Sequence, residues 1–186
     1  GYTDDSIYQR DNVNIKPGDR VLDVGANIGI FARFAADKGA SKIYSFEPVQ
    51  ENFQLLSLNR PEQCEAHRLA ISDTDNQSIN IAYKADAPGG SSVLKHDNGV
   101  LQNVMSMSLD TLINNGIVEG VDFMKMDIEG AEIEILESMK PEDWPSFVTH
   151  LVFEYSFDVD PSIPRFKKII DNLKEHFGFV HHRKMH

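Results

Sequence analysis

The chain has 186 residues, a length that suits one domain with a single core. Its 29 acidic and 18 basic residues give a formal net charge of -11, which argues against a nucleic-acid partner held through its phosphates. The single cysteine, Cys64, excludes an internal disulfide and predicts a reducing cytoplasm, and no apolar run reaches the length of a membrane span. We expect one domain over residues 1–186, with the start at Gly1 pointing to a longer parent chain that carries other domains.

The first two predicted strands alternate with the first two predicted helices along the chain. Residues 19–25, "DRVLDVG", form a short apolar run after a turn, and apolar residues at helical spacing follow from Ile28 until Gly39. Residues 42–47, "KIYSFE", repeat the strand signal, and Pro48 suits the first position of a second helix. The spacing predicts two successive strand-helix units.

The rest of the chain continues this alternation. Further strands are predicted at 65–71, 77–85, 103–109, 121–127, 145–155 and 178–182, and further helices at 108–115 and 163–177. The strict alternation of "AEIEIL", residues 131–136, also fits a strand. We favour a helix there, because Ala131 and Ile135 share one face and a parallel sheet needs a crossover. The sequence therefore predicts an α/β fold with a mostly parallel, doubly wound sheet and helices on both faces.

A glycine turn, "DVGANIG", ends the first predicted strand. Ligands of open α/β sheets bind beyond the carboxyl ends of the strands, and Gly25 and Gly29 would let a ligand approach the backbone closely. The dinucleotide fingerprint requires two further glycines, but Asn27 and Ile30 occupy those positions. The turn is therefore a poor match for pyrophosphate binding.

Two acidic residues flank this turn. Asp23 precedes Gly25 by two positions, and Glu47 ends the second predicted strand 22 positions after Gly25 (47 - 25). A carboxylate at the position of Glu47 can accept both hydroxyls of a ribose. A nucleoside cofactor without phosphate fits best, and S-adenosylmethionine is one whose cationic groups suit an acidic site.

Four motifs in order resemble the FkbM-type methyltransferases: "VLDVGANIGIFARFAA", "IYSFEP", "AISD" and "FMKMDIEGAEIEIL". That resemblance implies a Rossmann-like class I fold and S-adenosylmethionine-dependent methylation of hydroxyl groups, often on sugars. By position it implies that the glycine turn lines the methionine end, Glu47 holds the ribose, residues 71–73 flank the adenine and Asp127 faces the methionine portion or the reaction centre. Together the patterns assign these residues to the cofactor: Asp23, Gly25, Ala26, Asn27, Gly29, Glu47, Pro48, Ile71, Ser72, Asp73 and Asp127.

The acidic cluster that starts at Asp127 carries the predicted chemistry. A sugar hydroxyl is a poor nucleophile until it loses its proton, so we expect Asp127 and Glu129 to act as bases, with Glu154 converging from the next strand. The same three carboxylates also suit a divalent cation such as Mg²⁺. Glu134 and Glu137 are expected to form only the solvated face of a helix.

Three functions remain open on the sequence. The first is an S-adenosylmethionine-dependent O-methyltransferase that acts on a hydroxyl of a sugar, glycan or other small molecule. The second is an NAD-dependent oxidoreductase on the same Rossmann-like sheet, and the third is a non-catalytic module that binds S-adenosylmethionine. The missing fingerprint glycines count against the second, and the acids at Asp127, Glu129 and Glu154 count against the third.

Overall fold

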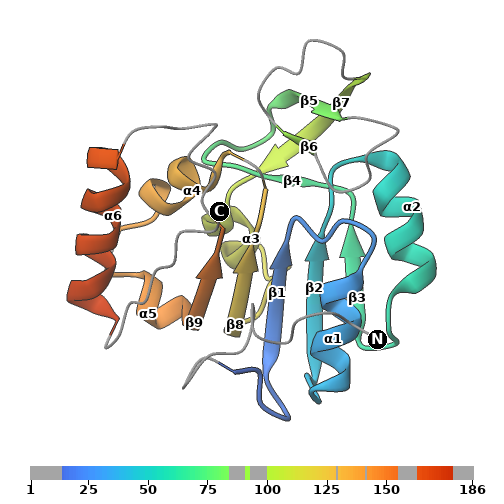
Figure 1. Ribbon diagram of the computed structural model, residues 1–186, viewed down its shortest axis with the longest axis horizontal. Coiled ribbons are helices and arrows are strands. Elements are labelled where there is room, and N and C mark those ends of the chain that lie inside the picture. The colour runs from blue at the N-terminus through green and yellow to red at the C-terminus, as the bar shows by residue number, and fades with distance from the viewer. Residues whose placement is uncertain are drawn as a thin grey trace.

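The computed structural model describes residues 14–83, 91–92, 100–128, 130–140, 142–154 and 163–177. Within these ranges, five strands form the central sheet: β1 (Arg20–Val24), β2 (Lys42–Phe46), β3 (Cys64–His67), β8 (Val121–Met126) and β9 (Val148–Phe153). They are parallel throughout and lie in the order β3-β2-β1-β8-β9 (Figure 1). The predicted α/β fold with a parallel sheet is confirmed.

Helices cover both faces of this sheet. The helices are α1 (Ile30–Asp37), α2 (Gln50–Asn59), α3 (Leu109–Asn114), α4 (Glu132–Ser138), α5 (Trp144–Phe147) and α6 (Ile163–His176). Successive side chains of a strand point to opposite faces, so Val21 packs in a cluster with α1, whereas Leu22 packs in the larger cluster with α3 to α6. Among the described residues, no helix combines the length and the apolar character needed to cross a bilayer.

A second, smaller sheet lies above the carboxyl ends of the central strands in Figure 1. Its strands are β4 (Ala70–Ile71), β5 (Ser78–Tyr83), β6 (Ser91–Ser92) and β7 (Val100–Met107), in the order β4-β7-β5-β6. It packs on the start of α2, where Val49 joins an apolar cluster with Ala70, Ile81 and Val104. Gln102 Oε1 also accepts the backbone N–H of Gln50 at 2.8 Å. The small sheet is thereby fixed beside the end of β2.

The predicted strand at 65–71 is wrong as one element, because two sheets divide it. The backbone N–H of Glu47 donates to the carbonyl oxygen of His67 at 3.1 Å, which keeps β3 in the central sheet up to its last residue. The chain then leaves that sheet, and Ala70–Ile71 pairs in parallel with β7. A local apolar pattern cannot show which sheet a strand joins.

Other boundaries also differ from the predictions. The strand predicted at 103–109 is β7, which spans Val100–Met107. Residues 145–155 were predicted as one strand, but the helical turn α5 opens with the fully buried Trp144 before β9 begins. Pro48 precedes α2 instead of starting it, because Val49 keeps an extended conformation and its N–H bonds to a Glu47 carboxylate oxygen at 2.9 Å. The predicted strand at 178–182 lies outside the described residues.

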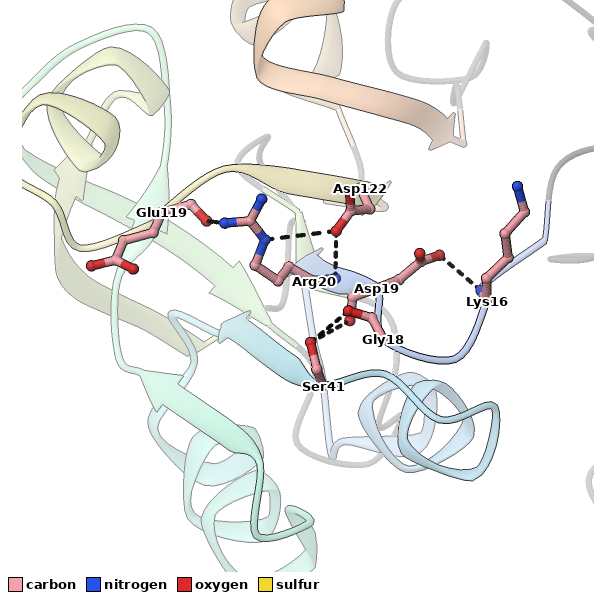
Figure 2. A network of polar contacts seen from close by, with 7 residues as sticks. All are labelled: Lys16, Gly18, Asp19, Arg20, Ser41, Glu119 and Asp122. Carbon is pink, nitrogen blue, oxygen red and sulfur yellow. Dashed lines mark hydrogen bonds and ion pairs between the residues drawn. The ribbon is translucent and has the colours of Figure 1, made fainter.

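Polar contacts pin the amino ends of the strands, at the edge opposite the glycine turn (Figure 2). The backbone N–H of Arg20 donates to Asp122 Oδ2 at 2.8 Å, and its guanidinium donates to the carbonyl oxygen of Glu119 at 2.9 Å. Ser41 Oγ donates to the carbonyl oxygen of Gly18 at 2.7 Å. These contacts fix the register of β1 against β2 and β8, on which the alignment of the opposite edge depends.

Asp75 ties the small sheet to α3. Its Oδ1 accepts the backbone N–H of Ser108 at 2.7 Å, and its Oδ2 accepts the hydroxyls of Thr111 and Ser108 at 2.7 and 3.1 Å. Ser108 is itself the N-cap of α3 and accepts the backbone N–H of Thr111. The backbone N–H of Ser108, followed by the Thr111 hydroxyl, holds the pKa of the Asp75 carboxyl below its usual value.

We expect Asp75→Ala to lower the unfolding temperature at pH 7 by about 2 to 4 °C. A carboxyl whose folded pKa is depressed stabilises the fold above its unfolded pKa, and this contribution is lost as the pH falls through the folded pKa. The difference from wild type should therefore shrink as the pH falls below the usual pKa of an aspartate, as thermal melts followed by circular dichroism from pH 7 downward will show. Asp37→Ala, on the exposed side of α1, serves as the control. A difference that does not shrink as the pH is lowered would contradict this assignment.

Candidate functional site

Four predicted site residues form a row at the carboxyl edge of the central sheet. Gly25, Glu47, Asp127 and Glu154 are each the first residue after a strand, following β1, β2, β8 and β9 respectively. The strands are in register there, so the row is continuous from Glu47 to Glu154. Backbone hydrogen bonds extend the sheet into this row, from Gly25 N to Phe46 O, Asp127 N to Val24 O and Glu154 N to Met126 O, each at 3.0 Å.

The glycine turn has a left-handed backbone at three of its residues. Gly25, Asn27 and Gly29 have φ angles of +78°, 50° and +90°. A Cβ atom on Gly25 would lie 1.9 Å from the carbonyl oxygen of Asp127, so only glycine allows the two loops to approach this closely. Ala26 is buried within the turn. The turn and the Asp127 loop are therefore one packed unit.

Glu47 holds this turn to the start of α2. The side chain is 2% exposed, and its Oε2 and Oε1 accept the backbone N–H groups of Asn27 at 2.8 Å and Val49 at 2.9 Å. Burial raises the pKa of the Glu47 carboxyl, and these two N–H groups partly oppose the rise. The Asn52 amide also donates to Oε1, at 3.4 Å. Each carboxylate oxygen has two lone pairs, so Oε2 can accept a further hydrogen bond from a ligand.

A buried ion pair lies two residues deeper in the sheet. Asp23 is 0% exposed and Lys125 is 6% exposed, and they are neighbours in the register of β1 and β8. Lys125 Nζ lies 3.4 Å from Asp23 Oδ1, 3.7 Å from Asp127 Oδ2 and 2.9 Å from the carbonyl oxygen of Gly25, to which it donates a hydrogen bond. Burial raises the pKa of Asp23, and the charge of Lys125 opposes this.

Sequence reasoning missed Lys125. The signal was available, because a lysine in the otherwise apolar run "FMKM" of a buried parallel strand has to be paired. The structure also changes the meaning of Asp23, which was predicted to bind cofactor but lies beneath the turn with no exposed surface.

Asp127 and Glu154 lie side by side at the end of β8 and β9. Asp127 is half-buried and Glu154 is exposed. Burial and then the negative charge of Asp127 raise the pKa of Glu154, while Lys125 lowers it. Glu129, the other predicted base, lies outside the described residues. The structure thus brings together two of the three predicted catalytic carboxylates, whose roles stay predictions.

The remaining acids of the cluster are accounted for by contacts within the fold. Glu132 is 1% exposed, and its two oxygens accept the backbone N–H groups of Ile128 at 3.0 Å and Gly130 at 2.9 Å, which folds the loop after Asp127. The expectation that Glu134 and Glu137 are only a solvated face needs correction. Both pair with the Arg165 guanidinium, at 3.0 and 2.7 Å, and this links α4 to α6. The expected helix over 131–136 is confirmed as α4.

The predicted adenine-flanking residues lie on the Glu47 side of the row. Ile71 and Ser72 are buried and Asp73 is exposed. They follow Ala70, which packs against Val49 two residues beyond Glu47. Pro48 is half-buried between Glu47 and Val49. These residues surround the end of β2, while Asp127 and Glu154 occupy the other end of the row.

The described residues contain no group of three or more His, Cys, Asp or Glu side chains arranged to hold a metal ion. Because Glu129 is not among them, the predicted set of Asp127, Glu129 and Glu154 is not tested as a whole. The metal site stays a prediction.

Comparison with curated proteins finds three relatives of similar identity. The AMB antimetabolite synthetase AmbE of Pseudomonas aeruginosa is 26% identical over 71% of this chain, the 31-O-demethyl-FK506 methyltransferase FkbM of Streptomyces tacrolimicus 26% over 76%, and the hexuronic acid methyltransferase AglP of Haloferax volcanii 27% over 77%. The matched parts make up 8%, 67% and 58% of those proteins.

The solved structure of a methyltransferase FkbM from Methylobacillus flagellatus KT aligns with 68% of this chain and 30% of its own, with a TM-score of 0.42 and 19% identity. The family model "Methyltransferase FkbM domain" matches residues 23–180, which include every residue of the row described above. Because this match takes in most of the sequence, the chain belongs to the methyltransferase FkbM domain family.

Proposed function

We propose that the protein is an S-adenosylmethionine-dependent O-methyltransferase that acts on a hydroxyl of a sugar, glycan or other small molecule. The observation that carries the proposal is the row from Glu47 to Glu154. In this row the glycine turn lies between Glu47, a carboxylate suited to ribose hydroxyls, and the carboxylate pair of Asp127 and Glu154. The acidic edge favours a cationic sulfonium and disfavours a pyrophosphate. Family membership also favours methyl transfer over the oxidoreductase alternative.

The residues of the turn fit the cofactor by their chemistry. Glu47 keeps a lone pair on Oε2 for a ribose hydroxyl although it already accepts two backbone N–H groups and the Asn52 amide. The left-handed backbone of Gly25, Asn27 and Gly29 would line the methionine portion, and residues 71–73 would flank the adenine. When bound, the cofactor supplies an electrophilic methyl group.

The carboxylates beyond β8 and β9 would serve the acceptor. In-line displacement requires alignment of the acceptor oxygen, the methyl carbon and the sulfur, which is mainly a matter of positioning. Asp127 would take the proton of the acceptor hydroxyl as its oxygen gains the methyl group and the carbon–sulfur bond breaks. Glu154 lies at the end of the adjacent strand, and Glu129 lies two residues further along the sequence. The products are a methyl ether and S-adenosylhomocysteine. A divalent cation such as Mg²⁺ on these three carboxylates is the alternative way to activate the hydroxyl.

Two relatives support the acceptor class by their names. One is a 31-O-demethyl-FK506 methyltransferase and the other a hexuronic acid methyltransferase, so one name specifies an oxygen and the other a sugar acid. We propose a hydroxylated small molecule or glycan for this chain too. We propose a reducing cytoplasm as the location of the protein, because its sequence has a single cysteine, Cys64, and so no internal disulfide.

Calorimetry with S-adenosylhomocysteine and NAD tests the cofactor. We expect S-adenosylhomocysteine to bind and NAD to give no heat. Glu47→Ala should weaken the binding of S-adenosylhomocysteine at least about tenfold, because hydrogen bonds to a charged group each contribute about 1.5 to 3 kcal/mol. Glu65→Ala is the matched control, since this carboxylate pairs with Lys42 on the neighbouring strand at 2.7 Å. Binding of NAD in place of S-adenosylhomocysteine would favour the oxidoreductase.

Transfer of labelled methyl groups to a panel of sugars and sugar acids tests the activity separately. A panel in which some member gains label supports the enzyme. If S-adenosylhomocysteine binds but no hydroxylated acceptor is ever labelled, the non-catalytic binding module becomes the better description.

A further inference from the structure

Lys125 occupies a place where the fold alone would favour an apolar side chain. It lies on β8 between Met124 and Met126, both fully buried, and is itself 6% exposed. A buried ammonium is tolerated only when it is paired and hydrogen-bonded. Replacing a buried ion pair by packed apolar residues is often neutral or stabilising. Stability by itself therefore gives little reason for a lysine at this position.

The contacts of the Lys125 ammonium join three parts of the site. The first part is Asp23 on β1. Both of its carboxylate oxygens are buried and accept no hydrogen bond in the described part of the chain. The other two parts are the glycine turn and Asp127: Lys125 Nζ donates to the carbonyl oxygen of Gly25 at 2.9 Å and lies 3.7 Å from Asp127 Oδ2. One charged group thus reaches both the glycine turn and the proposed base.

The direction of the Gly25 carbonyl matters for the turn. Gly25 adopts a left-handed backbone, and its N–H donates to the carbonyl oxygen of Phe46. Its own carbonyl points into the sheet toward Lys125, so the hydrogen bond fixes the orientation of the peptide unit that connects Gly25 to Ala26. This peptide unit opens the turn that would line the cofactor.

We propose that Lys125 is a positioning residue that locks the cofactor turn at Gly25 and the carboxylate of Asp127 into one arrangement. The inference rests on the proposed function, because it assigns the turn to S-adenosylmethionine and Asp127 to the acceptor. Asp23 balances the charge of the buried ammonium, while the hydrogen bond to the Gly25 carbonyl and the contact with Asp127 hold its position. This accounts for an acid beneath the turn that has no exposed surface.

Three variants separate positioning from stability: Lys125→Met, Asp23→Asn and the double variant Lys125→Met/Asp23→Asn. Lys125→Met leaves the Asp23 charge buried without its cation and should be strongly destabilised. The double variant removes both charges and should recover most of the lost unfolding temperature. The measurements are thermal melts, calorimetry with S-adenosylhomocysteine, and hydrogen exchange of the peptide that spans residues 23–29.

Positioning predicts that the double variant, although stable, binds S-adenosylhomocysteine at least about tenfold more weakly than wild type. It also predicts faster exchange in residues 23–29 with no change over α6. Asp23→Asn should bind within about threefold of wild type, a difference of under about 0.7 kcal/mol. Lys42→Met, which removes a half-buried lysine of β2 that pairs with Glu65, is the control and should bind normally.

If the stable double variant binds S-adenosylhomocysteine as tightly as wild type, Lys125 has a structural role only and the inference is overturned. If Asp23→Asn by itself loses binding as fully as the double variant, Asp23 and not Lys125 carries the effect, which also overturns it. A wild-type protein that gives no heat with S-adenosylhomocysteine is a different result, because it removes the proposed function on which the inference rests.

Discussion

Gly25→Ala should lower the free energy of unfolding by about 2 to 5 kcal/mol and remove measurable binding of S-adenosylhomocysteine. Two effects add. A left-handed backbone, φ +78° at Gly25, costs an L-residue about 1 to 2 kcal/mol. The new methyl group would also lie 1.9 Å from the carbonyl oxygen of Asp127, and relieving such an overlap in a packed region costs about 1 to 3 kcal/mol.

The overlap cannot be relieved by a side-chain rotation, because its partner is backbone. Asp127 is held by the hydrogen bond from its N–H to the carbonyl oxygen of Val24 at 3.0 Å. Any shift therefore moves either the glycine turn or the end of β8. Since the proposed cofactor would lie against this turn, we expect loss of binding even in the fraction of protein that remains folded.

Gly116→Ala is the matched control for this prediction. Gly116 also has a left-handed backbone, φ +67°, but a Cβ atom there would have no neighbour within 4 Å. The free energy of unfolding of Gly116→Ala should fall only by the cost of the left-handed backbone, about 1 to 2 kcal/mol, and the variant should bind S-adenosylhomocysteine normally. Urea unfolding and calorimetry of the two variants give both quantities. Equal losses of stability would show that the approach of Asp127 to Gly25 is not the cause.

The row of site residues could be predicted because, in a parallel sheet, the residue that ends each strand lies at the same edge. Each of Gly25, Glu47, Asp127 and Glu154 follows an apolar run, and the carboxyl ends of parallel strands meet at one edge. Locating four strand ends was therefore enough to bring these residues together, without any knowledge of side-chain packing. The helices at 30–37 and 163–176 followed from apolar spacing in the same way.

The parts that could not be predicted depend on partners distant in the sequence. The sequence shows that Lys125 needs a partner, but it does not show that this partner is Asp23, 102 positions earlier (125 - 23). Glu132 resembles its acidic neighbours in sequence, yet it alone among the described acids after Asp127 is fully buried by the loop it folds. Similarly, the break after His67 requires the small sheet, which Ala70–Ile71 joins.

Asp127→Asn should reduce kcat for methyl transfer by about 10² to 10⁴-fold at saturating S-adenosylmethionine. This corresponds to about 2.7 to 5.4 kcal/mol of barrier, since each tenfold change in rate equals about 1.36 kcal/mol. Asparagine keeps the shape of the side chain but cannot take the proton of the acceptor hydroxyl. Saturating cofactor removes any contribution from weaker binding at the turn. The rate is measured with the acceptor found in the labelled-methyl panel.

Two controls assign the loss to proton removal. Glu137→Gln changes an acid of the same segment that pairs with Arg165 away from the row, and kcat should not change. Glu154→Gln removes the carboxylate beside Asp127 and should lower kcat by less than about tenfold, because Asp127 still accepts the proton. Adding EDTA separates the two ways of activating the hydroxyl. A base needs no cation, so activity should survive the chelator, whereas a cation bound by these carboxylates would make wild type as inactive as Asp127→Asn.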